Sequence, residues 1–310
     1  MSPTPASATA SGSISGSGSV PGSARGTGDG AVRARRRERT RRLLFRAAAT
    51  AVVVWSVAPF LWQLSSSFQL DRDLASRTPH WLPVPGTLDH YRSVFGGHEF
   101  GAYLTNSVIV TVGATFVGLL LASLATYALA RLPVPGKGAV LALVLGLSMF
   151  PQISIVVPLY LALNRLGLLD TYHGLGGTYV GLALPLMIFV LYAHFRSLPA
   201  QLDEAAAIDG AGLLRTLRSI VLPLALPGIA AAAMLGFITN WNEFMLALAF
   251  TSSPEHQTVP VGIANFQSQY FIPWGDMAAA SVVVTLPLVV LVVVFQRRIV
   301  AGVTSGAVKE

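Results

Sequence analysis

The sequence predicts an all-α, polytopic membrane protein with six transmembrane helices. Of its 310 residues, 53% are hydrophobic and 11% are charged, whereas a soluble domain carries about 25% charged residues. Six apolar stretches also reach the roughly 20 residues that a helix needs to cross the hydrocarbon core of a bilayer. They lie at residues 44–66, 103–130, 139–163, 176–196, 224–251 and 278–296.

The region before the first apolar stretch differs in composition from the rest of the chain. Its first 30 residues are mostly Ser, Gly, Ala, Thr and Pro, which bury too little apolar surface to offset chain entropy. We therefore expect residues 1–42 to form a disordered basic cytoplasmic tail, residues 43–300 the transmembrane domain and residues 301–310 a cytoplasmic tail. The first apolar stretch lies too deep for a cleaved signal peptide, which favours an uncleaved helix.

Basic residues indicate the orientation of the chain. If the N-terminus is cytoplasmic, the inner segments hold seventeen Lys and Arg residues, eight of them arginines between Arg33 and Arg46, and the outer loops hold four. Because Lys and Arg concentrate on the cytoplasmic side, we expect a multi-pass protein of the cytoplasmic membrane with both termini in the cytoplasm. This topology explains the net charge of +7 better than a nucleic acid partner does, so we expect membrane lipid and no nucleic acid among the partners.

Prolines and small residues occur within the expected spans. Five of the six contain proline, which predicts kinks in those helices. The stretch 103–130 has none and instead spaces Ala114, Gly118 and Ala122 four residues apart, a stripe that permits close helix packing.

Several chemistries have no support in the sequence. The chain has no cysteine, and its six histidines show no metal-ligand spacing, so we expect no metal. We also expect no catalytic residue, since Ser148 has no histidine base in the last two spans. Gly136 and Lys137 are followed by Gly138 and lack the other features of an ATP-binding loop, so this chain binds no ATP or other cofactor of its own in our interpretation.

The stretch 197–223 between the fourth and fifth spans predicts a helix, a turn and a second helix. Pro199 suits a first helical turn, and Asp209 with Gly210 is a strong breaker. The second piece places Leu214, Leu217 and Val221 on one side until Pro223 opens the next span.

This stretch resembles the EAA loop of ABC importer permeases, with the spacing E-A-A-x-x-D-G-A followed by I-x-L-P. In that family the loop forms a coupling helix that docks into a groove of the cytosolic ATPase. Leu217 stands where many members carry an aromatic residue. The resemblance assigns ATPase coupling to Glu204, Ala205, Ala206, Asp209, Gly210, Ala211, Leu217 and Pro223.

The resemblance to carbohydrate-type permeases of the maltose, trehalose and glycerol-phosphate group extends over nearly the whole chain beyond residue 43. It rests on short motifs at residues 105–107, 127–131, 149–154, 157–160, 166–172, 241–244, 258–262 and 295–309. It implies a non-enzymatic permease subunit of an importer of a di- or oligosaccharide, with trehalose or maltose as the favoured cargo. Its partners would be a second permease subunit, two ATPase subunits that use ATP, and an extracytoplasmic sugar-binding protein, which we expect at the outer loop 252–276.

Glu243 is the single acidic residue within the expected spans, and it follows Asn240, Trp241 and Asn242. Ionisable groups inside membranes are functional candidates because leaving them in lipid is costly. We assign these four residues to the substrate path, with a structural hydrogen bond and simple interfacial solvation as the open alternatives. A secondary transporter without an ATPase is the alternative function, although the sequence shows neither internal repeats nor an ion-coupling cluster.

Overall fold

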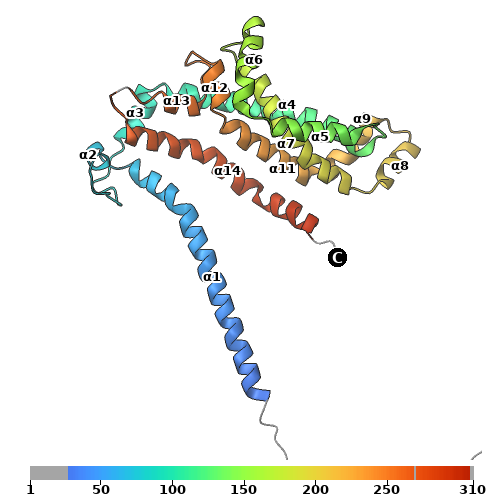
Figure 1. Ribbon diagram of the computed structural model, residues 1–310, viewed down its shortest axis with the longest axis horizontal. Helices are drawn as coiled ribbons and strands as arrows, with labels where there is room; N and C mark the ends of the chain where they lie inside the picture. The colour runs from blue at the N-terminus through green and yellow to red at the C-terminus, as the bar shows by residue number, and fades with distance from the viewer. Residues whose placement is uncertain (1–26, 269, 308–310) are drawn as a thin grey trace, which may run out of the picture. The chain divides into compact units, whose positions relative to one another are not determined.

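The computed structural model describes residues 27–268 and 270–307, and every regular element in that part of the chain is a helix (Figure 1). This confirms the all-α prediction. The first half holds α1 (Thr27–Ser66), α2 (Asp71–Leu74), α3 (Asp89–Gly97), α4 (Phe100–Arg131), α5 (Lys137–Ser148), α6 (Gln152–Arg165) and α7 (Tyr172–Ser197). The second half holds α8 (Gln201–Ile208), α9 (Leu213–Thr216), the π-helical turn η1 (Leu217–Val221), α10 (Leu222–Leu224), α11 (Leu226–Trp241), α12 (Met245–Phe250), α13 (Val259–Ala264) and α14 (Trp274–Ala307).

Helix α1 begins earlier than expected. Its residues 27–42 are helical, although we expected disorder for the whole segment 1–42, and residues 1–26 lie outside the described part. Ala, Arg and Glu dominate residues 31–42, and these are strong helix formers. Arg42 and Glu38, one helical turn apart, form an ion pair that adds to this preference.

Four helices in the described part are long and apolar enough to cross a membrane: Arg37–Ser66 within α1, α4, α7 and Trp274–Phe295 within α14. The other two expected spans are not single helices. The stretch 139–163 is the pair α5 and α6, bent by 94°, and the stretch 224–251 begins at a break of 84° between Leu213–Leu224 and α11.

Proline chemistry explains where these spans break. Pro151 lies between α5 and α6 and lacks the N–H that a continuous helix needs there. Pro223 and Pro227 flank Ala225, the residue at which α10 ends and α11 begins. A single proline inside α7 (Pro185) or α14 (Pro287) leaves those helices continuous.

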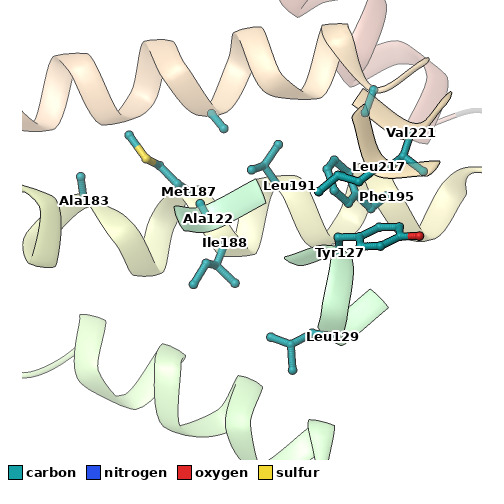
Figure 2. Close-up of a cluster of buried hydrophobic side chains, with 12 residues drawn as sticks. Ala122, Tyr127, Leu129, Ala183, Met187, Ile188, Leu191, Phe195, Leu217 and Val221 are labelled. Carbon is teal, nitrogen blue, oxygen red and sulfur yellow. The ribbon is translucent and has the colours of Figure 1, made fainter. Parts of the chain in front are cut away.

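The centre of the bundle is the pair α4 and α7, with α11 packed against both. The predicted small-residue stripe is confirmed: Ala114, Gly118 and Ala122 are buried, and a Cβ added at Gly118 would lie 3.2 Å from the sulfur of Met187 on α7. Figure 2 shows Ala122 of α4 beside Met187 and Leu191 of α7. Small side chains thus bring the two helix axes close enough for larger residues to fill the remaining space.

Large apolar side chains also face away from the bundle. On α4 these include Phe116 and Leu120, and on α14 Val290 and Val293. A soluble protein rarely exposes such continuous apolar faces, so these surfaces suit hydrocarbon.

Candidate functional site

The segment between α7 and α11 forms the helix, turn and second helix that the sequence predicts. Helix α8 ends at Ile208, and Gly210 adopts a left-handed φ of +73° that lets the chain turn before α9 begins at Leu213. A left-handed conformation favours glycine because it has no Cβ to clash with the backbone.

Four of the eight expected coupling residues are exposed on or directly after α8. Glu204, Ala205, Asp209 and Gly210 of the α8 region are exposed, while Ala206 faces inward with 3% exposure. Ala211 is half-buried, Leu217 is buried, and Pro223 is exposed at the far end of the segment. The expected residues thus divide into an outward group on α8 and an inward group that fixes the segment.

Three apolar residues that the sequence analysis did not assign lie in the same segment. Ile208, Leu213 and Leu214 are exposed by 87%, 59% and 70%. Leu214 was expected beside Leu217 and Val221, but those two side chains are buried while Leu214 is not. Leu214 lies at the start of α9, beside the exposed turn, whereas Leu217 and Val221 belong to the buried cluster around Phe195. Apolar side chains without a covering element indicate a docking surface.

A second candidate region lies at the end of α11, where the chain breaks before α12. Glu243 lies in this break with 6% exposure. Its Oε1 accepts hydrogen bonds from the backbone N–H of Leu246 at 2.8 Å and from Gln152 Nε2 at 2.8 Å, and its Oε2 accepts from the backbone N–H of Ala247 at 3.1 Å. The carboxylate therefore caps α12 and fastens it to the first residue of α6, which agrees with the structural alternative.

The neighbours of Glu243 point in different directions. Asn240 is buried, and its Nδ2 lies 3.4 Å from Thr115 Oγ1 of α4. Trp241 is buried, stacks on Phe237 and donates from Nε1 to a carbonyl oxygen of α14 at 3.3 Å. Asn242 is exposed. The four residues expected to line a path thus share one segment of chain but not one surface.

A cavity of about 760 Å³ opens beside this break. It lies against α5, α6, α7 and α11 and is mostly apolar. Its polar lining side chains are Ser148, Gln152, His173, Thr178 and Thr239. Gln152 therefore joins the cavity to the Glu243 cap, a role that the sequence signalled only by placing an amide directly after Pro151 within an apolar stretch.

Residues of two sequence motifs hold the loop that follows α12. Asn106 Nδ2 donates to the carbonyl oxygens of Pro254 and Gln257 at 3.0 and 2.9 Å. Ser107 Oγ accepts from the backbone N–H of Val259 at 2.7 Å, and Tyr172 Oη donates to Asn106 Oδ1 at 2.7 Å. These contacts give the motifs at 105–107 and 166–172 a structural reason.

Asp170 fastens the same loop from the other side. Its Oδ1 accepts from the backbone N–H groups of Ser252 at 3.0 Å and Ser253 at 3.2 Å. Burial acts to raise the pKa of this carboxyl, but the hydrogen bonds from Ser252 and Ser253 and the nearby His256 outweigh it and hold the pKa below its usual range.

Known proteins match this chain over most of its length. The family described as binding-protein-dependent transport system inner membrane component matches residues 32–305. The trehalose transport system permease protein SugB of Mycobacterium tuberculosis is 42% identical over 262 residues, which are 84% of this chain and 95% of that protein. The trehalose/maltose transport system permease protein MalG of Thermococcus litoralis is 42% identical over 282 residues, 88% of this chain and 99% of that protein.

Solved structures show the same fold. One chain of a bacterial ABC transporter involved in the import of the acidic polysaccharide alginate is similar with a TM-score of 0.74 and 20% identity, over 84% of this chain and 97% of that chain. A second structure, of a bacterial alginate transporter in complex with a pentasaccharide-bound periplasmic protein, is similar with a TM-score of 0.60 and 17% identity.

Proposed function

Because this chain belongs to the family of binding-protein-dependent transport system inner membrane components, we propose that it is the permease subunit of an ABC importer that moves a di- or oligosaccharide across the cytoplasmic membrane. The observation that carries the sugar assignment is the 42% identity to the two trehalose-type permeases over more than four fifths of the chain. An α-glucoside such as trehalose or maltose is our favoured cargo.

The proposed topology has six spans with both termini in the cytoplasm. Four single helices supply four of the spans, and each bent pair supplies one more. The distribution of seventeen inner and four outer basic residues supports this orientation. The domain limits that we propose remain a transmembrane domain at residues 43–300 with cytoplasmic tails on either side.

We propose that α8 is the coupling helix and docks into a groove of a cytosolic ATPase. Its outward residues Glu204, Ala205 and Ile208 combine a carboxylate with small and apolar side chains, which suits insertion into a partially apolar groove. Energy then comes from two ATPase subunits, and this chain contributes no catalytic residue, metal or cofactor of its own.

Two glycines in the turn provide a matched test of this docking. Gly210 has a φ of +73°, whereas Gly212 has a φ of −71°, and a Cβ added to either would meet no atom within 4 Å. We expect Gly210→Val to distort the turn and uncouple ATP hydrolysis from uptake, and Glu204→Lys to uncouple by reversing the charge at the groove. Gly212→Val should do neither, because its backbone conformation accepts any residue.

Sugar uptake and ATP hydrolysis, measured in proteoliposomes that contain the assembled transporter, test whether α8 couples the two. Coupled hydrolysis in both the Gly210→Val and Glu204→Lys transporters would remove α8 from the coupling role.

We propose that the cavity beside Gln152 and Glu243 forms this chain's side of the sugar path, with a second permease subunit completing it. Thr178, Thr239 and Gln152 supply hydroxyl and amide groups that suit a neutral sugar. Glu243 would act there by positioning α12 and Gln152, since its carboxylate accepts hydrogen bonds from Gln152 Nε2 and from the backbone N–H groups of Leu246 and Ala247.

The outer loop at 252–276 is our proposed contact for the extracytoplasmic binding protein. The loop exposes Tyr270 by 92%, Phe271 by 60% and Trp274 by 59%. Aromatic side chains of this kind are enriched in protein interfaces.

The cargo is tested by uptake of labelled sugars in cells that lack only this gene. We expect loss of trehalose or maltose uptake, restored by the wild-type gene. Unchanged uptake of every mono-, di- and oligosaccharide, together with loss of amino-acid or peptide uptake, would contradict the sugar assignment.

A further inference from the structure

One arginine at the end of α4 contacts the junction between α7 and α8, which begins 67 residues further along the chain. The Arg131 side chain is 6% exposed. Its Nη1 donates to the carbonyl oxygen of Leu198 at 2.9 Å and its Nη2 donates to the carbonyl oxygen of Pro199 at 3.1 Å. Its Nε lies 3.1 Å from Asp203 Oδ2.

Each of these contacts falls at a helix end. Leu198 directly follows the last residue of α7, where backbone carbonyls have no partner within the helix and carry partial negative charge. Asp203 lies in the first turn of α8, where a carboxylate is favourable. The planar guanidinium of an arginine carries N–H groups in fixed directions and can face two carbonyl oxygens and a carboxylate at once. A lysine ammonium is a single point of charge and cannot reproduce this geometry.

The inner face of α8 is held chiefly through these contacts. Ala206 is the buried residue of this helix, and Asp203 is paired with Arg131. The neighbouring Glu204 and Ala205 face outward and remain exposed. The Asp203 carboxylate is therefore paired with Arg131 of the membrane domain, whereas the Glu204 carboxylate is available to a partner.

A displacement of the end of α4 that carries Arg131 would reach the centre of the bundle. Tyr127 and Leu129, within one turn of Arg131 on α4, belong to the same buried cluster as Phe195 of α7 and Leu217 of the π-helical turn (Figure 2). Tight packing of this kind transmits displacement because its side chains cannot move independently.

We propose that Arg131 is a positioning residue for energy coupling, which holds α8 in register with the ends of α4 and α7 so that displacement of α8 moves both spans. This rests on the proposed docking of α8 on an ATPase. Without the guanidinium, α8 can tilt at Pro199 while the spans stay in place, and ATP is hydrolysed without uptake.

The test compares Arg131→Gln, Arg131→Lys and Asp203→Asn in the assembled transporter in proteoliposomes, with Arg196→Gln as the control. Arg196 is an exposed arginine in the last turn of α7, so its removal takes a positive charge from the same region without touching the clamp. The measured quantity is sugar taken up per ATP hydrolysed, alongside the amount of ATPase that copurifies.

We expect the ratio to fall at least about tenfold in Arg131→Gln and Asp203→Asn, since both variants lose the largely buried ion pair between the two side chains, with ATPase still copurifying. The double variant Arg131→Gln/Asp203→Asn should be no worse than Arg131→Gln alone, because that single change already removes the ion pair with Asp203. Arg131→Lys keeps the charge and thus the assembly, and should still lose at least about threefold. If Arg131→Gln does not assemble, Arg131→Lys tests the positioning role of Arg131.

A wild-type ratio in the assembled Arg131→Lys and Asp203→Asn transporters would overturn the proposal. Gly210→Val, measured alongside, separates this result from failure of the docking proposal. If Gly210→Val uncouples and the clamp variants do not, α8 still couples but without Arg131. If all of them retain the wild-type ratio, the coupling role of α8 is also wrong.

Discussion

Replacement of Glu243 by alanine should weaken the protein through the cap of α12. The change removes acceptors from two buried backbone N–H groups, those of Leu246 and Ala247, and from the half-buried amide of Gln152. An unsatisfied buried donor costs about 1–3 kcal/mol. The Gln152 amide borders the cavity and can turn to another partner, so the two backbone groups set the expected loss at about 2–6 kcal/mol.

Glu243→Gln provides an intermediate. Its amide oxygen can still accept from one of the two backbone N–H groups, but its NH₂ group faces the other donor, so we expect a loss of about 1–2 kcal/mol. Asn242→Ala is the matched control because it precedes Glu243 directly, is exposed, and gives up a single hydrogen bond, from its Nδ2 to the carbonyl oxygen of Ile238 at 2.8 Å. Exposed substitutions of this kind change stability by about 0.5 kcal/mol or less.

Thermal unfolding of the assembled transporter, followed by size-exclusion chromatography after heating, measures these effects. The melting temperature should fall in the order wild type and Asn242→Ala, then Glu243→Gln, then Glu243→Ala. The reasoning fails if Glu243→Ala melts with the wild type. If that variant also loses sugar uptake, the carboxylate acts on the transported sugar and not on α12.

Three further predictions follow from the fold. Single cysteines in this cysteine-free chain should react with an impermeant reagent at position 256 but not at 212 in intact cells, and labelling at 212 would contradict the six-span topology. Gly174→Ala should lower the melting temperature because its Cβ would lie 2.0 Å from a backbone carbonyl oxygen, and Gly236→Ala should lower it less because its Cβ would meet the movable end of a methionine; equal melting would refute this. Asp170→Asn should destabilise the protein at pH 7, where the lowered pKa of Asp170 favours the folded state, and this difference should vanish as the pH falls below about 3.9 and through the folded-state pKa; a difference independent of pH would show that its charge is not involved.

The sequence predicts the helices well because their apolar stretches are continuous and local. It predicts kinks at the prolines but not which of them break a span, since Pro151 lies at a 94° break whereas α7 continues through Pro185. The motif spacing predicts that Gly210 ends α8, because a left-handed turn needs a glycine at one position in the chain.

Contacts between distant segments have no signature in a single sequence. Gln152 and Glu243 are 91 residues apart, and Arg131 meets Leu198 across 67 residues. Each of these polar residues lies within or beside an apolar stretch, but the neighbouring sequence does not indicate which distant residue it contacts. The substrate-path assignment of Asn240 and Trp241, which stays a prediction, grouped them by adjacency in the chain, whereas their side chains contact different helices, α4 and α14.

The two broken spans have a consequence for how this transporter can be studied by mutagenesis. Where a helix stops within a membrane domain, several main-chain N–H and C=O groups lose their partners in the helix and become available to other polar molecules. Such groups belong to every residue and survive any side-chain replacement. Alanine scanning across residues 148–152, between α5 and α6, or 241–245, between α11 and α12, would therefore leave any main-chain contact with the sugar undetected, and replacement of an amide by an ester bond at these positions would expose it.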